Sequence, residues 1–85
     1  MKTFAYTITD PLGIHARPAG QLVKKCSEFE SAVTIEKDGK SADAKRIFGI
    51  MGLAVKQGNE ITVKTDGSDE SEAADAIASF LRENL

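Results

Sequence analysis

Hydrophobic and smaller residues alternate at the start of the chain. Between residues 3 and 9, Phe4, Tyr6 and Ile8 are separated by Ala and Thr. This period of two predicts a half-buried β-strand. Asp, Pro and Gly at positions 10, 11 and 13 end the pattern, so we expect the strand to stop there.

The next segment has a helical period. Over residues 16–27 we expect a helix with Pro18 in its first turn, where the missing N–H is tolerated, and with Lys24 and Lys25 near its C-terminal end. Its predicted apolar stripe consists of Ala16, Ala19, Leu22, Val23 and Cys26.

Alternation returns at residues 32–37, with Val33 and Ile35 on one face. Asp38-Gly39 is a two-residue turn signal, and residues 40–44 form the expected return strand of a hairpin. Because that strand is weakly apolar, we expect it at an edge of the sheet.

The most apolar stretch is residues 47–55, which contains two glycines, so we predict a short helix followed by an irregular packed segment. Residues 60–65 predict a fourth strand with Ile61 and Val63 buried. A last helix is expected over residues 69–83, with Asp69 and Glu72 at the spacing of a capping box and Ser68 as a competing N-cap. Its predicted apolar face consists of Ala73, Ala76, Ile77, Phe80 and Leu81.

The order β-α-β-β-α-β-α fits a single α/β (α+β) domain over residues 1–85. Short turns favour antiparallel strands, and amphipathic helices need a sheet face to cover. We therefore expect a two-layer sandwich with one sheet face open to solvent.

Charge and cysteine content limit the classes of function that this chain can have. A formal net charge of −2 argues against nucleic-acid binding, and no apolar run is long enough for a membrane span. A single histidine and a single cysteine make a metal site improbable. Cys26 cannot form an internal disulfide, so we expect a cytoplasmic protein. Because Cys26 lies on the apolar stripe of the predicted helix, we expect it to be a small core residue.

The segment Gly13-Ile14-His15-Ala16-Arg17-Pro18 carries the candidate chemistry. The start of a helix offers unpaired backbone N–H groups, here those of Ala16 and Arg17, and a partial positive charge that attracts phosphate. That charge favours a neutral, nucleophilic His15, and the guanidinium of Arg17 can bind phosphoryl oxygens. We expect Gly13 to allow a tight turn and to leave room for a partner. On local physics alone, however, a lone surface histidine is more often an ordinary loop or cap residue.

The run Gly-Ile-His-Ala-Arg-Pro-Ala at residues 13–19 resembles the active-site signature of HPr, the histidine-containing phosphocarrier of the bacterial sugar phosphotransferase system. A second resemblance lies between Lys45 and Gly58, and length and element order also agree. The resemblance implies an open-faced sandwich with strand order 1-4-2-3 and three helices on one face. It implies that His15, through Nδ1, accepts a phosphoryl group from phospho-enzyme I, derived from phosphoenolpyruvate, and passes it to sugar-specific EIIA proteins or domains. Arg17 matches the active-site arginine of the family. We expect a monomeric carrier rather than an enzyme, without a cofactor.

In the family, the short helix after the hairpin presents apolar side chains to both partners. We expect Ile47, Phe48 and Met51 in this docking surface, and Ile50, Leu53 and Val55 in the core. Two positions depart from the family pattern. Arg46 replaces a serine that a kinase phosphorylates in many relatives, so we expect a fixed positive charge there to favour acidic partners. Ala54 stands where glycine is common, and is strained unless its φ is negative.

Other functions remain open from the sequence. An HPr-like chain can be a regulatory binding module, or a carrier in a nitrogen-related or dihydroxyacetone-kinase phosphorelay. An unrelated ferredoxin-like domain that binds RNA or a small molecule would need a basic aromatic sheet face or a ligand pocket. The predicted open face offers Thr and Glu instead.

Overall fold

Four antiparallel strands form one sheet in the order β1-β4-β2-β3. This computed structural model describes all 85 residues. The strands are β1 (Lys2–Thr7), β2 (Ala32–Lys37), β3 (Lys40–Asp43) and β4 (Glu60–Asp66). The weakly apolar β3 lies at an edge, as predicted, and β1 forms the other edge.

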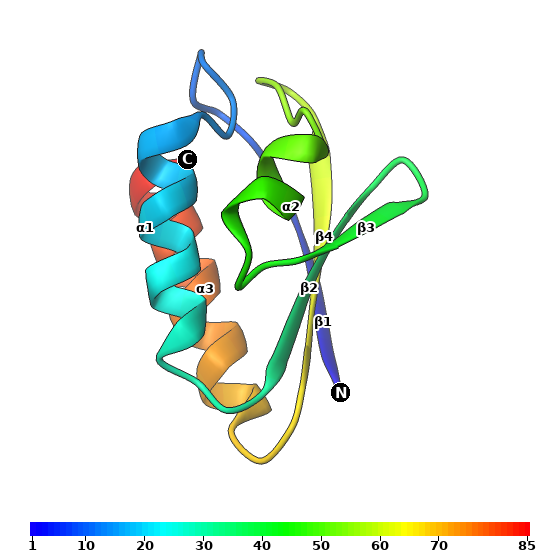
Figure 1. Cartoon of the computed structure of the whole chain (residues 1–85), viewed down its shortest axis with the longest axis vertical. Helices are drawn as coiled ribbons and strands as arrows, with labels where there is room; N and C mark the ends of the chain where they lie inside the picture. The colour runs from blue at the N-terminus through cyan, green and yellow to red at the C-terminus, as the bar shows by residue number, and fades with distance from the viewer.

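Three helices complete the fold: α1 (Ala16–Ser27), α2 (Ile47–Gly52) and α3 (Glu70–Asn84). The helices lie on one side of the sheet, and α1 runs alongside α3 (Figure 1). The predicted open-faced sandwich and its strand order are therefore confirmed. No helix is both long and apolar enough to span a bilayer.

One continuous core lies between the helices and the sheet. Ile61 and Val63 of β4 are fully buried, as predicted, and so is Ile50 of α2. Leu53 and Val55 are also buried, which confirms their placement. The core further includes the following residues: Ile8, Ala19, Leu22, Cys26, Val33, Ile35, Ala73, Ile77 and Leu81.

Cys26 is a core residue, as expected. Its side chain is completely buried, and burial raises the pKa of the thiol to about 12. A thiol with so high a pKa stays protonated near neutral pH and is a poor nucleophile. Ala16, by contrast, is exposed, so its assignment to the buried stripe of α1 was wrong. As the first helical residue, it lies beyond the part of α1 that covers the sheet.

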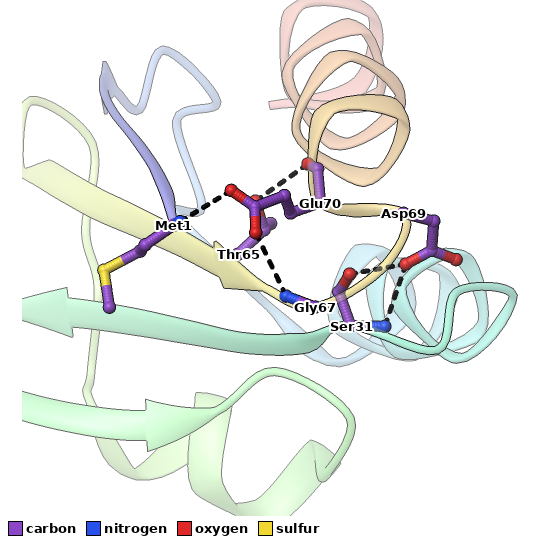
Figure 2. Close-up of polar contacts among 6 residues, drawn as sticks. All are labelled: Met1, Ser31, Thr65, Gly67, Asp69 and Glu70. Atoms are coloured by element: carbon purple, nitrogen blue, oxygen red, sulfur yellow. Dashed lines mark hydrogen bonds and ion pairs between the residues drawn. The ribbon is translucent and has the colours of Figure 1, made fainter.

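The predicted capping box at the start of α3 does not form (Figure 2). Asp69 is the N-cap residue, but its carboxylate accepts hydrogen bonds from the backbone N–H groups of Glu30 and Ser31 and from the Ser31 hydroxyl. These bonds, above all that from the Ser31 hydroxyl, lower the pKa of Asp69. Ser68, the competing candidate, does not cap the helix, and its hydroxyl donates to the carboxylate of Glu30. The α1–β2 loop has thus replaced Glu72 and the helix backbone as the partner of Asp69.

A second carboxylate, that of Glu70, makes contacts at the same end of the molecule. Glu70 accepts a hydrogen bond from the backbone N–H of Gly67 and lies 2.6 Å from the amino group of Met1 (Figure 2). The Thr65 hydroxyl donates to the Glu70 carbonyl oxygen. These contacts join β1, β4 and α3 at the end of the sheet where β1 begins.

Candidate functional site

His15 is the residue immediately before α1. Its backbone is extended, with φ −93° and ψ 177°, and its carbonyl oxygen accepts the hydrogen bond from the N–H of Ala19. Its side chain makes no capping hydrogen bond, although an N-cap side chain commonly does. The imidazole is therefore left available at the positive end of the helix, partly exposed at 36% of its side-chain surface.

The loop that precedes His15 is fixed to the backbone after α2. Gly13 has φ +67°, a left-handed conformation that favours glycine. A Cβ atom there would lie 2.2 Å from the carbonyl oxygen of Val55 and 2.7 Å from Cα of Lys56. The next residue, Ile14, is buried and donates its N–H to the same Val55 oxygen at 3.1 Å. Gly13 does allow the tight turn, but the chain's own backbone fills the space that we expected a partner to use.

Backbone donors at the start of α1 face outward without partners. Neither Ala16 nor Arg17 donates its N–H to any backbone or side-chain acceptor of the chain. The structure thus leaves unoccupied both donors that the sequence assigned to phosphate binding, and these donors carry the positive end of the helix dipole. Arg17 itself is exposed and enters none of the chain's ion pairs.

His15 and Arg17 line one surface hollow. Its wall contains no hydrophobic residue and consists of Asp10, His15, Arg17, Pro18, Gln21 and Asn84. Asn84 comes from the C-terminal end of α3, which lies beside the start of α1 (Figure 1). A polar hollow that combines a histidine, a guanidinium and unpaired helix N–H groups is suited to a small anion.

Sequence reasoning did not assign Asp10, Gln21 or Asn84 to this site. Gln21 is recognisable in retrospect, because residues 17 and 21 share a helix face. Asp10 was interpreted only as the residue that ends β1, and Asn84 is distant in sequence. The local turn at residues 10–13 brings Asp10 near His15, and the tertiary fold brings Asn84 there.

The predicted docking residues lie on α2. Phe48 is 88% exposed and Met51 39% exposed, which is unusual for large apolar side chains. Ile47 is half-buried and packs against the core, so only part of its side chain is available to a partner. Arg46, the N-cap of α2, is exposed and lies 3.8 Å from the Asp43 carboxylate.

Contacts to α1 and to the hairpin hold α2 in place. A Cβ atom built on Gly20 of α1 would lie 3.8 Å from Cδ1 of Ile47, which places the start of α2 against α1. Gly20 follows His15 by five residues, about 7.5 Å along a helix. The Lys37 side chain donates to the carbonyl oxygens of Leu53 and Ala54 just after α2. The exposed apolar residues therefore belong to a helix that packs against α1, which begins next to His15.

Ala54 has a positive φ, the condition under which the sequence predicted backbone strain. Its φ is +52°, in the left-handed region that disfavours any residue with a Cβ atom. Its N–H donates to the carbonyl oxygen of Met51, and its own carbonyl oxygen accepts from Lys37. These bonds maintain the conformation that ends α2 and directs Val55 toward the core.

Comparison with known proteins identifies the family of this chain. A family model described as the PTS HPr component phosphorylation site matches residues 2–83. The chain belongs to the HPr family. The phosphocarrier protein HPr of Lysinibacillus sphaericus is 51% identical over 83 residues, which cover 98% of this chain and 94% of that relative.

Solved structures of HPr proteins have the same fold. The histidine-containing phosphocarrier protein of a mycoplasma is 40% identical and superimposes with a TM-score of 0.94. The match covers 96% of this chain and 93% of the mycoplasma chain. An HPr dimer from Thermoanaerobacter tengcongensis is 41% identical, with a TM-score of 0.78. The match covers 98% of this chain and 95% of that chain. The HPr fold therefore extends over the whole length of the sheet and its three helices.

Proposed function

We propose that this HPr-family chain carries a phosphoryl group on His15 from phospho-enzyme I, itself charged from phosphoenolpyruvate, to sugar-specific EIIA proteins or domains. The observation that carries the proposal is an uncapped histidine at the start of α1 beside the unpaired N–H groups of Ala16 and Arg17. The lone pair of Nδ1 forms the new N–P bond, and the atom of enzyme I that releases the phosphoryl group keeps the electron pair of the bond that breaks.

Arg17 and the helix start stabilise the phosphoryl oxygens in this proposal. The guanidinium has five N–H donors and no competing partner within the chain, so it can turn toward the hollow when the group arrives. The two backbone N–H groups are fixed by α1 and need no rearrangement, which is how oriented dipoles stabilise transferred charge.

Both partners dock on α2 in this proposal. Phe48 and Met51 supply exposed apolar surface, with the available part of Ile47 at its margin. Arg46 adds a fixed positive charge at the start of α2, which suits acidic partner surfaces. The chain acts as a cytoplasmic monomer that is a relay carrier rather than an enzyme, because the machinery that directs transfer lies in its partners.

A reconstituted relay tests this function. The chain is incubated with enzyme I and labelled phosphoenolpyruvate, and an EIIA protein is then added. Label should appear on the chain and then pass to EIIA. An Arg17→Ala variant should slow both steps, whereas Lys40→Ala, which removes an exposed cation from the first residue of β3, should not. A chain that accepts label but never discharges it to any EIIA protein would contradict the carrier function and favour a regulatory module or another relay.

A further inference from the structure

The Asp10 carboxylate is fixed beside His15. One of its oxygens, Oδ2, lies 3.5 Å from Nε2 of the imidazole. The other, Oδ1, accepts the N–H of Leu12 at 2.8 Å, and the Asp10 carbonyl oxygen accepts the N–H of Gly13 at 2.9 Å. The Asp10 N–H donates to the carbonyl oxygen of Leu85 at 2.9 Å. One hydrogen bond therefore orients the carboxylate, and two others fix the backbone of Asp10.

We propose that Asp10 is a positioning residue for phosphoryl transfer, which accepts the Nε2 proton of His15 in a hydrogen bond and so leaves the lone pair on Nδ1. A neutral imidazole carries one proton, and its location depends on what each ring nitrogen faces. An ionised carboxylate can only accept, so it favours the tautomer with the proton on Nε2. The 3.5 Å separation closes to a hydrogen bond with a small rotation of the ring, as sites without substrate often require.

The transfer step gives the same carboxylate a second effect. When Nδ1 forms the N–P bond, Nε2 keeps its proton, and the ring gains a formal positive charge. That charge is shared with the Nε2–H group that faces Asp10, so a fixed negative charge already lies where positive charge develops. When the next acceptor takes the phosphoryl group, the electron pair of the N–P bond returns to Nδ1, and the ring becomes neutral again.

Asp10 is the only negatively charged group in the hollow. Arg17 has only donors, and the Asn84 amide donates to the carbonyl oxygen of Phe80. Asp10 is the one carboxylate that lines the hollow and the one side chain within ion-pair distance of the imidazole. The inference rests on the proposed function of His15 and adds to it a choice between the two ring nitrogens.

An Asp10→Asn variant separates positioning from folding. The amide oxygen of asparagine can still accept from Leu12, which retains the turn, but its NH₂ group then faces Nε2 and favours the proton on Nδ1. Nitrogen-15 NMR of the neutral imidazole should show the Nε2–H tautomer in the wild type and a shift toward Nδ1–H in the variant. The rate of transfer from enzyme I should fall about tenfold, the loss expected for one hydrogen bond to a charged group.

Two further variants complete the test. Asp10→Ser can retain the turn through its hydroxyl but is too short to reach the ring, so transfer should slow without a full reversal of the tautomer. Asp75→Asn removes one exposed carboxylate from α3 and should change neither measurement.

The outcomes distinguish this inference from the proposed function. An unchanged tautomer ratio in Asp10→Asn, or transfer at the wild-type rate, would overturn the role of Asp10 while wild-type phosphorylation continued to support His15. A wild-type chain that enzyme I leaves unmodified would overturn the proposed function itself, whatever the tautomer.

Discussion

Replacing Gly13 by alanine should release the loop that holds His15. The new Cβ atom would lie 2.2 Å from the carbonyl oxygen of Val55 and 2.7 Å from Cα of Lys56. Both obstacles are backbone atoms, so no side-chain rotation relieves the clash. The loop must move away from residues 55 and 56, and the hydrogen bond between the Ile14 N–H and the Val55 oxygen must lengthen or break.

A matched glycine sets the magnitude. Gly39 also has a positive φ, +80°, but nothing lies within 4 Å of the Cβ position, so Gly39→Ala suffers only the left-handed backbone cost of about 1–2 kcal/mol. Gly13→Ala suffers a similar cost, together with about 1–3 kcal/mol for overpacking and about 1 kcal/mol for the Ile14 hydrogen bond. The free energy of unfolding should therefore be about 2–4 kcal/mol lower in Gly13→Ala than in Gly39→Ala.

Urea unfolding of both variants at pH 7 measures this difference. Amide hydrogen exchange adds a local test, because the Ile14 amide should lose protection in Gly13→Ala and keep it in Gly39→Ala. If the two variants were equally stable and equally protected, the close approach of the His15 loop to residues 55 and 56 would not exist as described.

Three other predictions follow from single residues. Ala54→Gly should raise the free energy of unfolding by about 0.5–1 kcal/mol, because relief at φ +52° exceeds the entropy cost of glycine; a loss of stability in calorimetry would contradict this. Phe48→Ala should raise the KM of enzyme I for this chain about tenfold. Its free energy of unfolding should stay within about 0.5 kcal/mol of the wild type, since the Phe48 side chain is 88% exposed. An unchanged KM would exclude Phe48 from the docking surface. The hydrogen bond from the Ser31 hydroxyl holds the pKa of Asp69 below its usual value in the folded protein. The stability that Asp69 contributes is therefore complete above about pH 4, the usual pKa of the unfolded chain, and is lost as the pH falls through the lower pKa of the folded state. The wild type should therefore be more stable than Asp69→Asn at pH 7, with a gap that narrows in urea titrations below pH of about 4; a constant gap would exclude this linkage.

The hydrophobic pattern was sufficient for the strands and for the position of His15, and the family resemblance added the sheet order. Alternation identified the strands because one sheet face is buried, and Pro18 with the 16–27 apolar period located the start of α1. The family resemblance then favoured a nucleophile over an ordinary cap residue, which local physics alone did not.

Tertiary contacts account for what the sequence did not predict. The Asp69–Glu72 spacing is local, but Asp69 bonds to a loop 38 residues away, which no capping pattern reveals. The position of Asp10 beside His15 also depends on a distant residue, because the Asp10 N–H donates to the carbonyl oxygen of Leu85. The space beside Gly13 is filled by backbone from the α2–β4 connection. Each case involves a contact with a segment distant in sequence, which a local pattern does not show.

Intact-mass spectrometry after incubation with phosphoenolpyruvate and enzyme I tests the central claim most directly. The wild-type chain should gain one phosphoryl group that is labile in acid and stable in base, and His15→Ala should gain none. Phosphorylation that persists in His15→Ala, or a wild-type adduct that is stable in acid, would contradict the account of His15 as the phosphoryl carrier.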